Sequence, residues 1–370
     1  MVASVIGLWI MGPMQTRWLA GWKDSGTKPA IYHCVSRVVD RRLVFGPDER
    51  ERFRTCMRMY EAFSGCRVLA YCVMSNHFHI LLEVPPMPAG GLSDEEFARR
   101  LGALYGPGEV REVMEGVRDL RARGLENEAA AAMERHTYRM HDLSEFMKGL
   151  LVRFTMWFNR RHGREGTLWE RRFKSVIVES GTAARTMAAY IDLNPVRAGM
   201  VGDPADYRWS SCGEAVGGGP RGSGRMAREG LVRALRSADG VGFEAKHWPE
   251  VAKDYRAIMG RALERKPGRS TGAESAGESG KSGESFGGEP ESGELETERS
   301  LARMLTRRVR YFTDGAVIGS RAFVDAVFRE SRERFGAKRK DGARKMRGAG
   351  APAAGTLWSL RDLRKDVGDP

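Results

Sequence analysis

The sequence predicts an α+β fold in which helices pack on a ferredoxin-like antiparallel sheet. Between residues 31 and 194, apolar patterns of strand and helix type follow in the order strand, helix, strand, strand, helix, strand, helix. Two of the strands meet at Ser75-Asn76, a turn dipeptide that indicates a hairpin. An α+β domain of this kind usually segregates its helices onto an antiparallel sheet.

The first elements follow from β-branched residues and from helical spacing. Residues 31–39 predict a strand and residues 47–65 a helix. Residues 68–74 and His77–Val84 predict the two strands of the hairpin. Prolines directly after the second of these strands end it, because proline has no backbone N–H for the sheet.

The later elements follow a polar segment. Residues 89–140 are charged and helix-prone, and we expect them to form a helical insertion. Residues 143–163 carry apolar side chains at the i, i+3, i+4, i+7 spacing of an amphipathic helix. Residues 172–178 predict the fourth strand, and a last helix at residues 182–194 ends before Pro195.

The segments around this predicted core, residues 30–213, differ from it in composition. Residues 1–29 are predicted to form a poorly ordered leader, whose first 14 residues are apolar and lack the charged start of a signal peptide. Residues 214–266 predict a helical extension. Residues 267–297 hold seven Glu, two basic residues and two bulky apolar residues, which is typical of a flexible linker.

Residues 298–370 are predicted to form a basic helical C-terminal module. From residue 301 onward there are 17 Lys and Arg against 8 Asp and Glu. Ser320 can cap a helix. The apolar stripe of that helix consists of Phe323, Val324, Val327 and Phe328. Two arrangements stay open: a tethered second DNA-binding module, or helices folded back on the core.

Composition favours a nucleic-acid partner and a reducing compartment. The chain has 370 residues, 61 Lys and Arg against 48 Asp and Glu, and a formal net charge of +13. Its five cysteines include no C-x-x-C pair, and an odd count fits a disulfide framework poorly. The apolar start is too short to span a bilayer before Arg17. We therefore expect a cytoplasmic, nucleoid-associated protein that makes no membrane contact.

Two pairs of residues carry candidate chemistry. His77 and His79 alternate along a predicted strand, so both imidazoles project from one face. Tyr190 and Asn194 are four apart on a predicted helix and share a face. The alternatives are surface histidines, a core tyrosine and a helix-ending asparagine. The spacing alone does not place the helix against the strand.

The run YCVMSNHFHILLEV, followed about a hundred residues later by YIDLNPVRAGMV, resembles the HUH-type single-tyrosine transposases. The resemblance is greatest to the REP-associated tyrosine transposases. Supporting stretches are VSRVVDRRLVF, FMKGLLVRFTMWFNRRHGREGTLWERRF and DYRWSS. Together they extend from about residue 31 to residue 211, roughly half of the chain.

This resemblance implies an enzyme that cleaves and rejoins single-stranded DNA at hairpin-flanked sites through a 5′-phosphotyrosine intermediate. Position by position, it makes Tyr190 the nucleophile and His77 and His79 metal ligands. Asn194 falls where the family has its third ligand. The insertion, the linker and the C-terminal module lie outside the shared core.

The chemistry suits these residue types. A tyrosine nucleophile conserves bond energy in a covalent product, and a divalent cation offsets charge on the phosphoryl oxygens. Two imidazoles and an amide oxygen suit Mg²⁺ or Mn²⁺, whereas zinc is disfavoured because no cysteine accompanies the pair.

Basic and aromatic residues predict contacts with single-stranded and hairpin DNA, because cations bind phosphates and rings stack on bases. The alternative is that aromatic residues such as Trp157 and Phe173 belong to the core and that the arginines form a solvated face. The predicted DNA-binding residues are Arg37, Arg41, Arg42, Arg153, Arg160, Arg161, Arg164, Trp169, Arg171, Arg172, Lys174 and Arg197.

Two other functions remain alternatives: an HUH replication or conjugation nickase, and a non-cleaving DNA- or RNA-binding protein that keeps the fold. The NPVRAG sequence after the tyrosine favours the transposase. The intact His77, His79, Tyr190 and Asn194 set favours cleavage. The sequence leaves open whether one site works alone or two cooperate in a homodimer.

Overall fold

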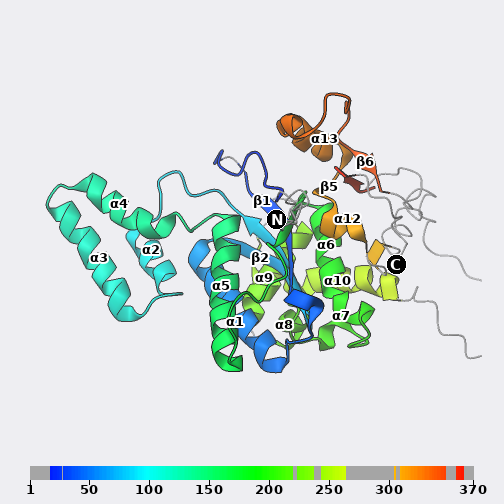
Figure 1. Ribbon diagram of the computed structural model, residues 1–370, viewed down its shortest axis with the longest axis horizontal. Coiled ribbons are helices and arrows are strands. Elements are labelled where there is room, and N and C mark those ends of the chain that lie inside the picture. Colours follow the sequence, from blue (N-terminus) through cyan, green and yellow to red (C-terminus); the bar gives the residue numbers. More distant parts are fainter. Residues whose placement is uncertain are drawn as a thin grey trace, which may run out of the picture.

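A mixed sheet in the order β2-β3-β1-β4-β5-β7-β6 forms the centre of the molecule (Figure 1). The computed structural model describes residues 17–26, 28–219, 223–236, 243–263, 304–305, 309–346 and 356–361. The predicted linker at residues 267–297 lies outside the described residues.

The first four strands form the ferredoxin-like part of the sheet. They are β1 (Ala30–Arg37), β2 (Arg67–Val73), β3 (His77–Val84) and β4 (Lys174–Val178). Each neighbouring pair is antiparallel, with β1 between β3 and β4. Because a helix connects β1 to β2, the two strands are not neighbours. β3 lies between them and pairs with both, which leaves β2 at the edge of the sheet. The predicted fold class is therefore confirmed.

Two long helices cover one face of this sheet. They are α1 (Pro47–Ser64) and α5 (Leu143–His162), and the glycines that follow them, Gly65 and Gly163, adopt positive φ values of 72° and 58°. The helices approach closely at Gly149, where a Cβ atom would lie 2.2 Å from the Tyr60 ring. Aromatic and aliphatic side chains of β3 fill the space beneath them.

The opposite face is covered by helices that follow β4. They are α6 (Thr182–Asp192), α7 (Asn194–Arg197), α8 (Ser211–Gly217), α9 (Ser223–Arg236) and α10 (Trp248–Leu263). The sequence predicts one helix to residue 194, whereas α6 ends at Asp192 and α7 restarts at Asn194, with Pro195 in its first turn. The sheet therefore separates two hydrophobic cores.

Three helices between β3 and α5 project away from the sheet (Figure 1). They are α2 (Asp94–Leu101), α3 (Pro107–Ala122) and α4 (Glu126–Thr137). A small apolar cluster that includes Phe63 and Phe97 joins them to the end of α1. Short 3-10 turns elsewhere are η1 (Val39–Arg41), η2 (Pro204–Asp206), η3 (Ala245–His247) and η4 (Arg332–Arg334).

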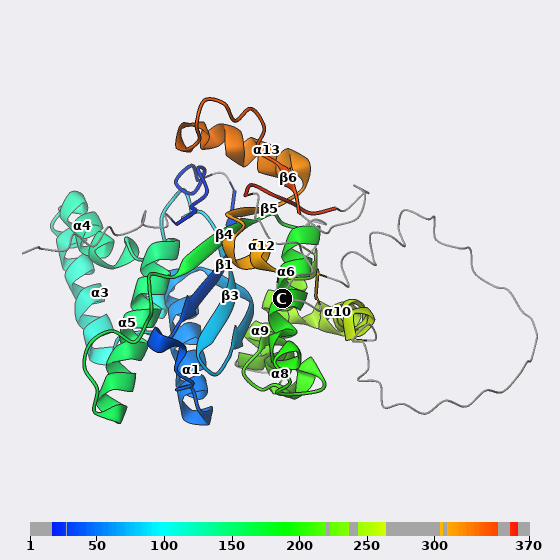
Figure 2. The ribbon, with the colours of Figure 1, turned by 45° about the vertical axis from the view of Figure 1, so that its right-hand side comes forward.

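The C-terminal segment extends the sheet of the core. Its elements are α12 (Arg310–Asp314), β5 (Val317–Gly319), α13 (Arg321–Glu330), β6 (Arg344–Lys345) and β7 (Trp358–Ser359). β5 runs parallel to β4, and α12 lies against β1 and β4 (Figure 2). Of the two arrangements that the sequence leaves open, the described residues of this segment adopt the one packed on the core.

Residues 17–26, assigned from the sequence to a poorly ordered leader, pack on the body of the protein. Trp18 stacks on Phe335 with ring centroids 5.8 Å apart, and the backbone N–H of Ala20 donates to the Tyr32 hydroxyl at 3.1 Å. The leader prediction is wrong for these residues because their apolar side chains cover β1 and α13. Residues 1–16 lie outside the described residues.

Two further features concern disulfide bonds and membrane spans. All five cysteines are buried and unpaired. Among the described residues, every helix is too short or too polar to span a lipid bilayer.

Candidate active site

Tertiary structure brings the two candidate pairs together. His77, His79, Tyr190 and Asn194 line one pocket of about 180 Å³. The imidazoles of His77 and His79 have centroids 5.2 Å apart, and the Tyr190 ring lies 6.2 Å from that of His79. They meet because α6 packs on the sheet face to which both histidines project. The other lining residues are Arg37, Met74, Arg197, Ala198, Val309, Arg310 and Thr313.

His77 lies at the start of β3 and is half-buried. Its Nδ1 is 2.8 Å from the side-chain oxygen of Asn76, and the Asn76 amide nitrogen donates to the carbonyl of Arg41 at 2.7 Å. Because an amide oxygen only accepts, this contact places the His77 ring proton on Nδ1 and the lone pair on Nε2. The lone pair is what a metal ligand requires.

His79 lies deeper, with 4% of its surface exposed, and stacks beside His33 of β1. His33 Nε2 is 2.9 Å from His79 Nδ1, and His33 Nδ1 is 2.7 Å from the Phe312 carbonyl oxygen. Burial lowers the pKa of His33 to about 4 and that of His79 well below its ordinary value. Both rings are therefore neutral near pH 7, and neutral imidazole is the form that binds metals.

Tyr190 is held on two sides of its ring. The Arg197 guanidinium carbon lies 4.1 Å from the ring centroid, and the Phe312 ring meets it edge-on at 4.6 Å. Arg197 also donates to the Tyr190 carbonyl at 2.6 Å and to the Leu305 carbonyl at 2.7 Å. These contacts fix the direction in which the phenol faces the pocket.

Asn194 has its amide nitrogen engaged by the preceding turn. That nitrogen donates to the carbonyls of Tyr190, at 3.3 Å, and Ile191, at 3.1 Å. The amide oxygen is thus the Asn194 atom with lone pairs to offer in the pocket. Proline at the next position fixes the turn that presents it.

The donor set fits a hard or borderline divalent cation. In the described part of the chain no group of three His, Cys, Asp or Glu side chains is placed to hold a metal ion, and the Asn194 amide oxygen is a further neutral donor in this pocket. Two imidazole nitrogens and one amide oxygen suit Mn²⁺ well and Mg²⁺ acceptably.

Three arginines line the same pocket, a composition that suits an anionic ligand. Arg37 comes from the end of β1, Arg197 from α7, and Arg310 from α12. Arg310 and Thr313 were missed in the sequence because no local periodicity links residues so far from the histidines. His33 was also missed, although it lies four residues before Arg37 on a predicted strand, so that both side chains share one face of the sheet.

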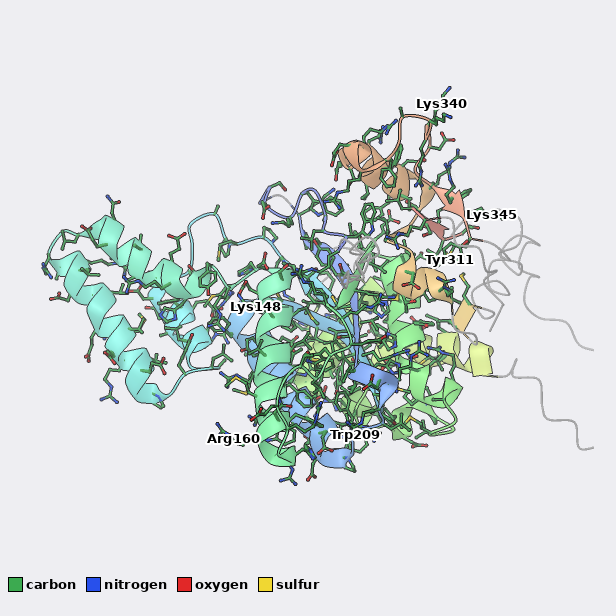
Figure 3. All side chains as sticks on the ribbon, viewed as in Figure 1. Lys148, Arg160, Trp209, Tyr311, Lys340 and Lys345 are labelled. Atoms are coloured by element: carbon green, nitrogen blue, oxygen red, sulfur yellow. The ribbon has the colours of Figure 1, made fainter. Side chains whose placement is uncertain are left out.

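Most of the predicted DNA-binding arginines lie on the surface. Arg160 is exposed at the end of α5 (Figure 3), and the Arg161 guanidinium pairs with Asp48 at 3.0 Å. Arg153 and Arg164 are half-buried over aromatic rings. Arg41, Arg42, Arg171 and Arg172 are exposed.

The structure corrects the expected role of Trp169. This residue is 9% exposed, its ring packs against those of Phe45, Phe53 and Phe78, and its indole N–H donates to Thr155 at 2.9 Å. Its ring belongs to the core and has no open face on which a base could stack.

Two cations in the predicted DNA-binding set have partners inside the protein. Lys174 pairs with Asp314 of α12 at 2.7 Å, and Arg197 supports Tyr190 as described above. The sequence could not show the Lys174 pair because Asp314 is distant in the chain, whereas Arg197 lies only seven residues after Tyr190.

Comparison with known proteins agrees with the motifs. Residues 27–89, which contain β1, α1, β2 and β3, match the family model for IS200-like transposases. The solved structure of a REP-associated tyrosine transposase bound to a REP hairpin aligns with 58% of this chain and 90% of its own, at 14% identity and a TM-score of 0.35. No curated protein matches the chain. Residues 27–89 are therefore similar to IS200-like transposases, in agreement with the resemblance that the motifs of this segment indicate.

Proposed function

We propose that this protein cleaves and rejoins single-stranded DNA, with Tyr190 as nucleophile and with His77, His79 and Asn194 as ligands of one Mg²⁺ or Mn²⁺ ion. The observation that carries the proposal is that all four side chains line one pocket together with three arginines. Periodicity alone does not predict that meeting.

The reaction exchanges one phosphate ester for another. The Tyr190 hydroxyl oxygen forms a bond to phosphorus as its proton passes to water. The bond from phosphorus to the 3′ oxygen breaks, and that oxygen takes up a proton as a free 3′-hydroxyl. The DNA 5′ end remains esterified to Tyr190, so attack by a 3′-hydroxyl reverses the step and rejoins a strand. A bound divalent ion would offset negative charge on the phosphoryl oxygens and orient the phosphate.

The arginines of the pocket bind and orient the substrate. Arg37 and Arg310 approach the pocket from separate elements and supply cationic donors for the oxygens of the scissile phosphate. Arg197 holds the tyrosine ring and its backbone carbonyl, so its main role is to keep the nucleophile in place.

A second hollow lies where β1 ends and offers a route for the DNA strand. Its volume is about 470 Å³, and Arg42 and Arg164 line it together with Phe158 and His162. Arg37, the last residue of β1, belongs to the catalytic pocket, so the two hollows are close along the chain. The two arginines suit the phosphates of a single strand, the kind of DNA that the family resemblance implies next to a hairpin.

Covalent capture tests the proposal directly. Wild-type protein is incubated with Mn²⁺ and a hairpin oligonucleotide that has single-stranded flanks and a 3′-end label, and it is then separated under denaturing conditions. We expect a labelled protein band that Tyr190→Phe abolishes while DNA binding stays within a few fold.

The matched control is Tyr138→Phe, because Tyr138 is an exposed tyrosine of the insertion, 56% accessible, and lies outside the pocket. An undiminished band from Tyr190→Phe would remove this residue from its role. Binding by the wild type without any covalent band on its cognate DNA would favour the non-cleaving alternative.

A further inference from the structure

A chain of two hydrogen bonds links the C-terminal segment to His79. It begins at the backbone carbonyl of Phe312 in α12, which lies 2.7 Å from His33 Nδ1, and continues from His33 Nε2 to His79 Nδ1 over 2.9 Å. His33 is 0% exposed and His79 is 4% exposed. Water therefore has little access to either contact.

The direction of both hydrogen bonds follows from the carbonyl. A carbonyl oxygen can only accept, so the single proton of a neutral His33 ring must be on Nδ1. His33 Nε2 then carries a lone pair and accepts, which requires a proton on His79 Nδ1. A charged His33 would carry a proton on both ring nitrogens and could donate to His79 instead, but complete burial disfavours the charged form.

We propose that His33 is a positioning residue that holds His79 in the Nδ1–H tautomer, and that the Phe312 carbonyl in turn fixes His33. The inference rests on the proposed function, in which His79 Nε2 is a metal ligand. With its proton on Nδ1, His79 presents the Nε2 lone pair in a fixed ring orientation. The C-terminal segment is then part of the metal site, although it contributes no ligand.

The other histidine is oriented in the same way by a different part of the chain. His77 donates through Nδ1 to Asn76, which donates to the backbone carbonyl of Arg41. Each chain of hydrogen bonds ends on a main-chain carbonyl, which cannot reverse its polarity. The two chains approach from the loop after β1 and from α12, so the ligands are oriented independently.

Pairing of the sheet holds α12 in the place that this arrangement needs. Ile177 of β4 donates its N–H to the Ala316 carbonyl at 2.8 Å, four residues after Phe312. The Phe312 ring is itself 0% exposed and rests on Tyr190. The Phe312 carbonyl therefore belongs to a segment that is held by the β4 contact and by the packing of the Phe312 ring on Tyr190.

The first test uses metal-free protein and nitrogen-detected NMR of the histidine rings. We expect His79 of the wild type to be neutral with its proton on Nδ1. His33→Leu removes the acceptor and should release His79 into a mixture of tautomers. His33→Gln can offer a side-chain oxygen near the position of Nε2 and should keep most of the Nδ1–H form. His79 of the wild type with its proton on Nε2 would overturn the proposal.

The second test measures Mn²⁺ affinity by electron paramagnetic resonance in the absence of DNA. Partners of ligating histidines typically contribute roughly 10–100-fold to metal affinity, so we expect a loss of that size in His33→Leu and a smaller one in His33→Gln. The matched control is His141→Leu, since His141 also contacts a carbonyl, that of Pro85, but lies at the insertion.

The outcomes separate this proposal from the proposed function. A folded His33→Leu with unchanged tautomer and affinity would overturn the positioning role. If His33→Leu does not fold, the wild type and His33→Gln decide the tautomer. If the wild type binds no Mn²⁺, the metal site is wrong, and the tautomer of His79 in metal-free protein still shows whether His33 positions it.

Discussion

The two faces of β3 have opposite chemistry within eight residues. Phe78, Ile80 and Leu82 face α1 and α5 and are each 0% exposed. His77 and His79 alternate with them and face α6, α7 and the C-terminal segment. One face supplies packing energy along the strand, whereas the other presents lone pairs to a pocket at its start and joins the second core at Leu81. The pleat of a strand keeps these two tasks on opposite sides, so each can be altered alone.

The largest expected effect is a loss of cleavage on substitution of a residue on the pocket side of β3. His77→Ala removes a proposed ligand that is only half-buried, so cleavage should fall by roughly 10²–10³-fold or more while the protein stays folded. Chelator should lower cleavage by the wild type by a similar factor. Covalent capture and circular dichroism of the same samples check this, and chelator-resistant cleavage would refute the single-metal site.

The neighbouring residue should give the reverse result. Phe78 packs against Phe53 with centroids 4.7 Å apart, and Phe78→Ala leaves a cavity in that core. We expect the free energy of unfolding to fall by about 3–5 kcal/mol. Denaturant titration measures this, and an unchanged unfolding midpoint would mean that this face does not carry the packing energy.

A smaller loss of cleavage is expected on substitution of Asn194, the first residue of α7. Asn194→Ala removes an uncharged ligand and leaves both histidines, so cleavage should fall by roughly 10–100-fold. Raised Mn²⁺ should restore part of it, because the defect is in metal affinity. Cleavage titrated against Mn²⁺ tests this, and a loss insensitive to the metal would assign Asn194 a structural role.

The smallest effect concerns a cation that the sequence assigned to DNA. Lys174 pairs with Asp314 and has a 45% exposed side chain, so Lys174→Ala should cost below about 1 kcal/mol of stability. Its paired ammonium should add nothing to DNA affinity. Arg172→Ala, which removes the exposed neighbour, is the matched comparison. A lower slope of log affinity against log salt for Lys174→Ala alone would restore Lys174 to the DNA interface.

Sequence by itself determined the local elements and the face of each candidate residue. Strand alternation places both histidines on one side of β3, and helical spacing places Tyr190 and Asn194 on one side of a turn, because these periods are properties of the backbone. The motif around the two histidines also indicated a transposase, and residues 27–89, which contain it, match the model for IS200-like transposases.

Tertiary structure alone decided which distant residues complete the pocket. Parallel pairing of β5 with β4 places α12 over the site, so Arg310, Thr313 and the Phe312 carbonyl meet the histidines. The same packing buries Trp169 and pairs Lys174, which removes them from the predicted interface. Contacts between segments so far apart depend on how whole elements pack, and no periodicity within one segment encodes that.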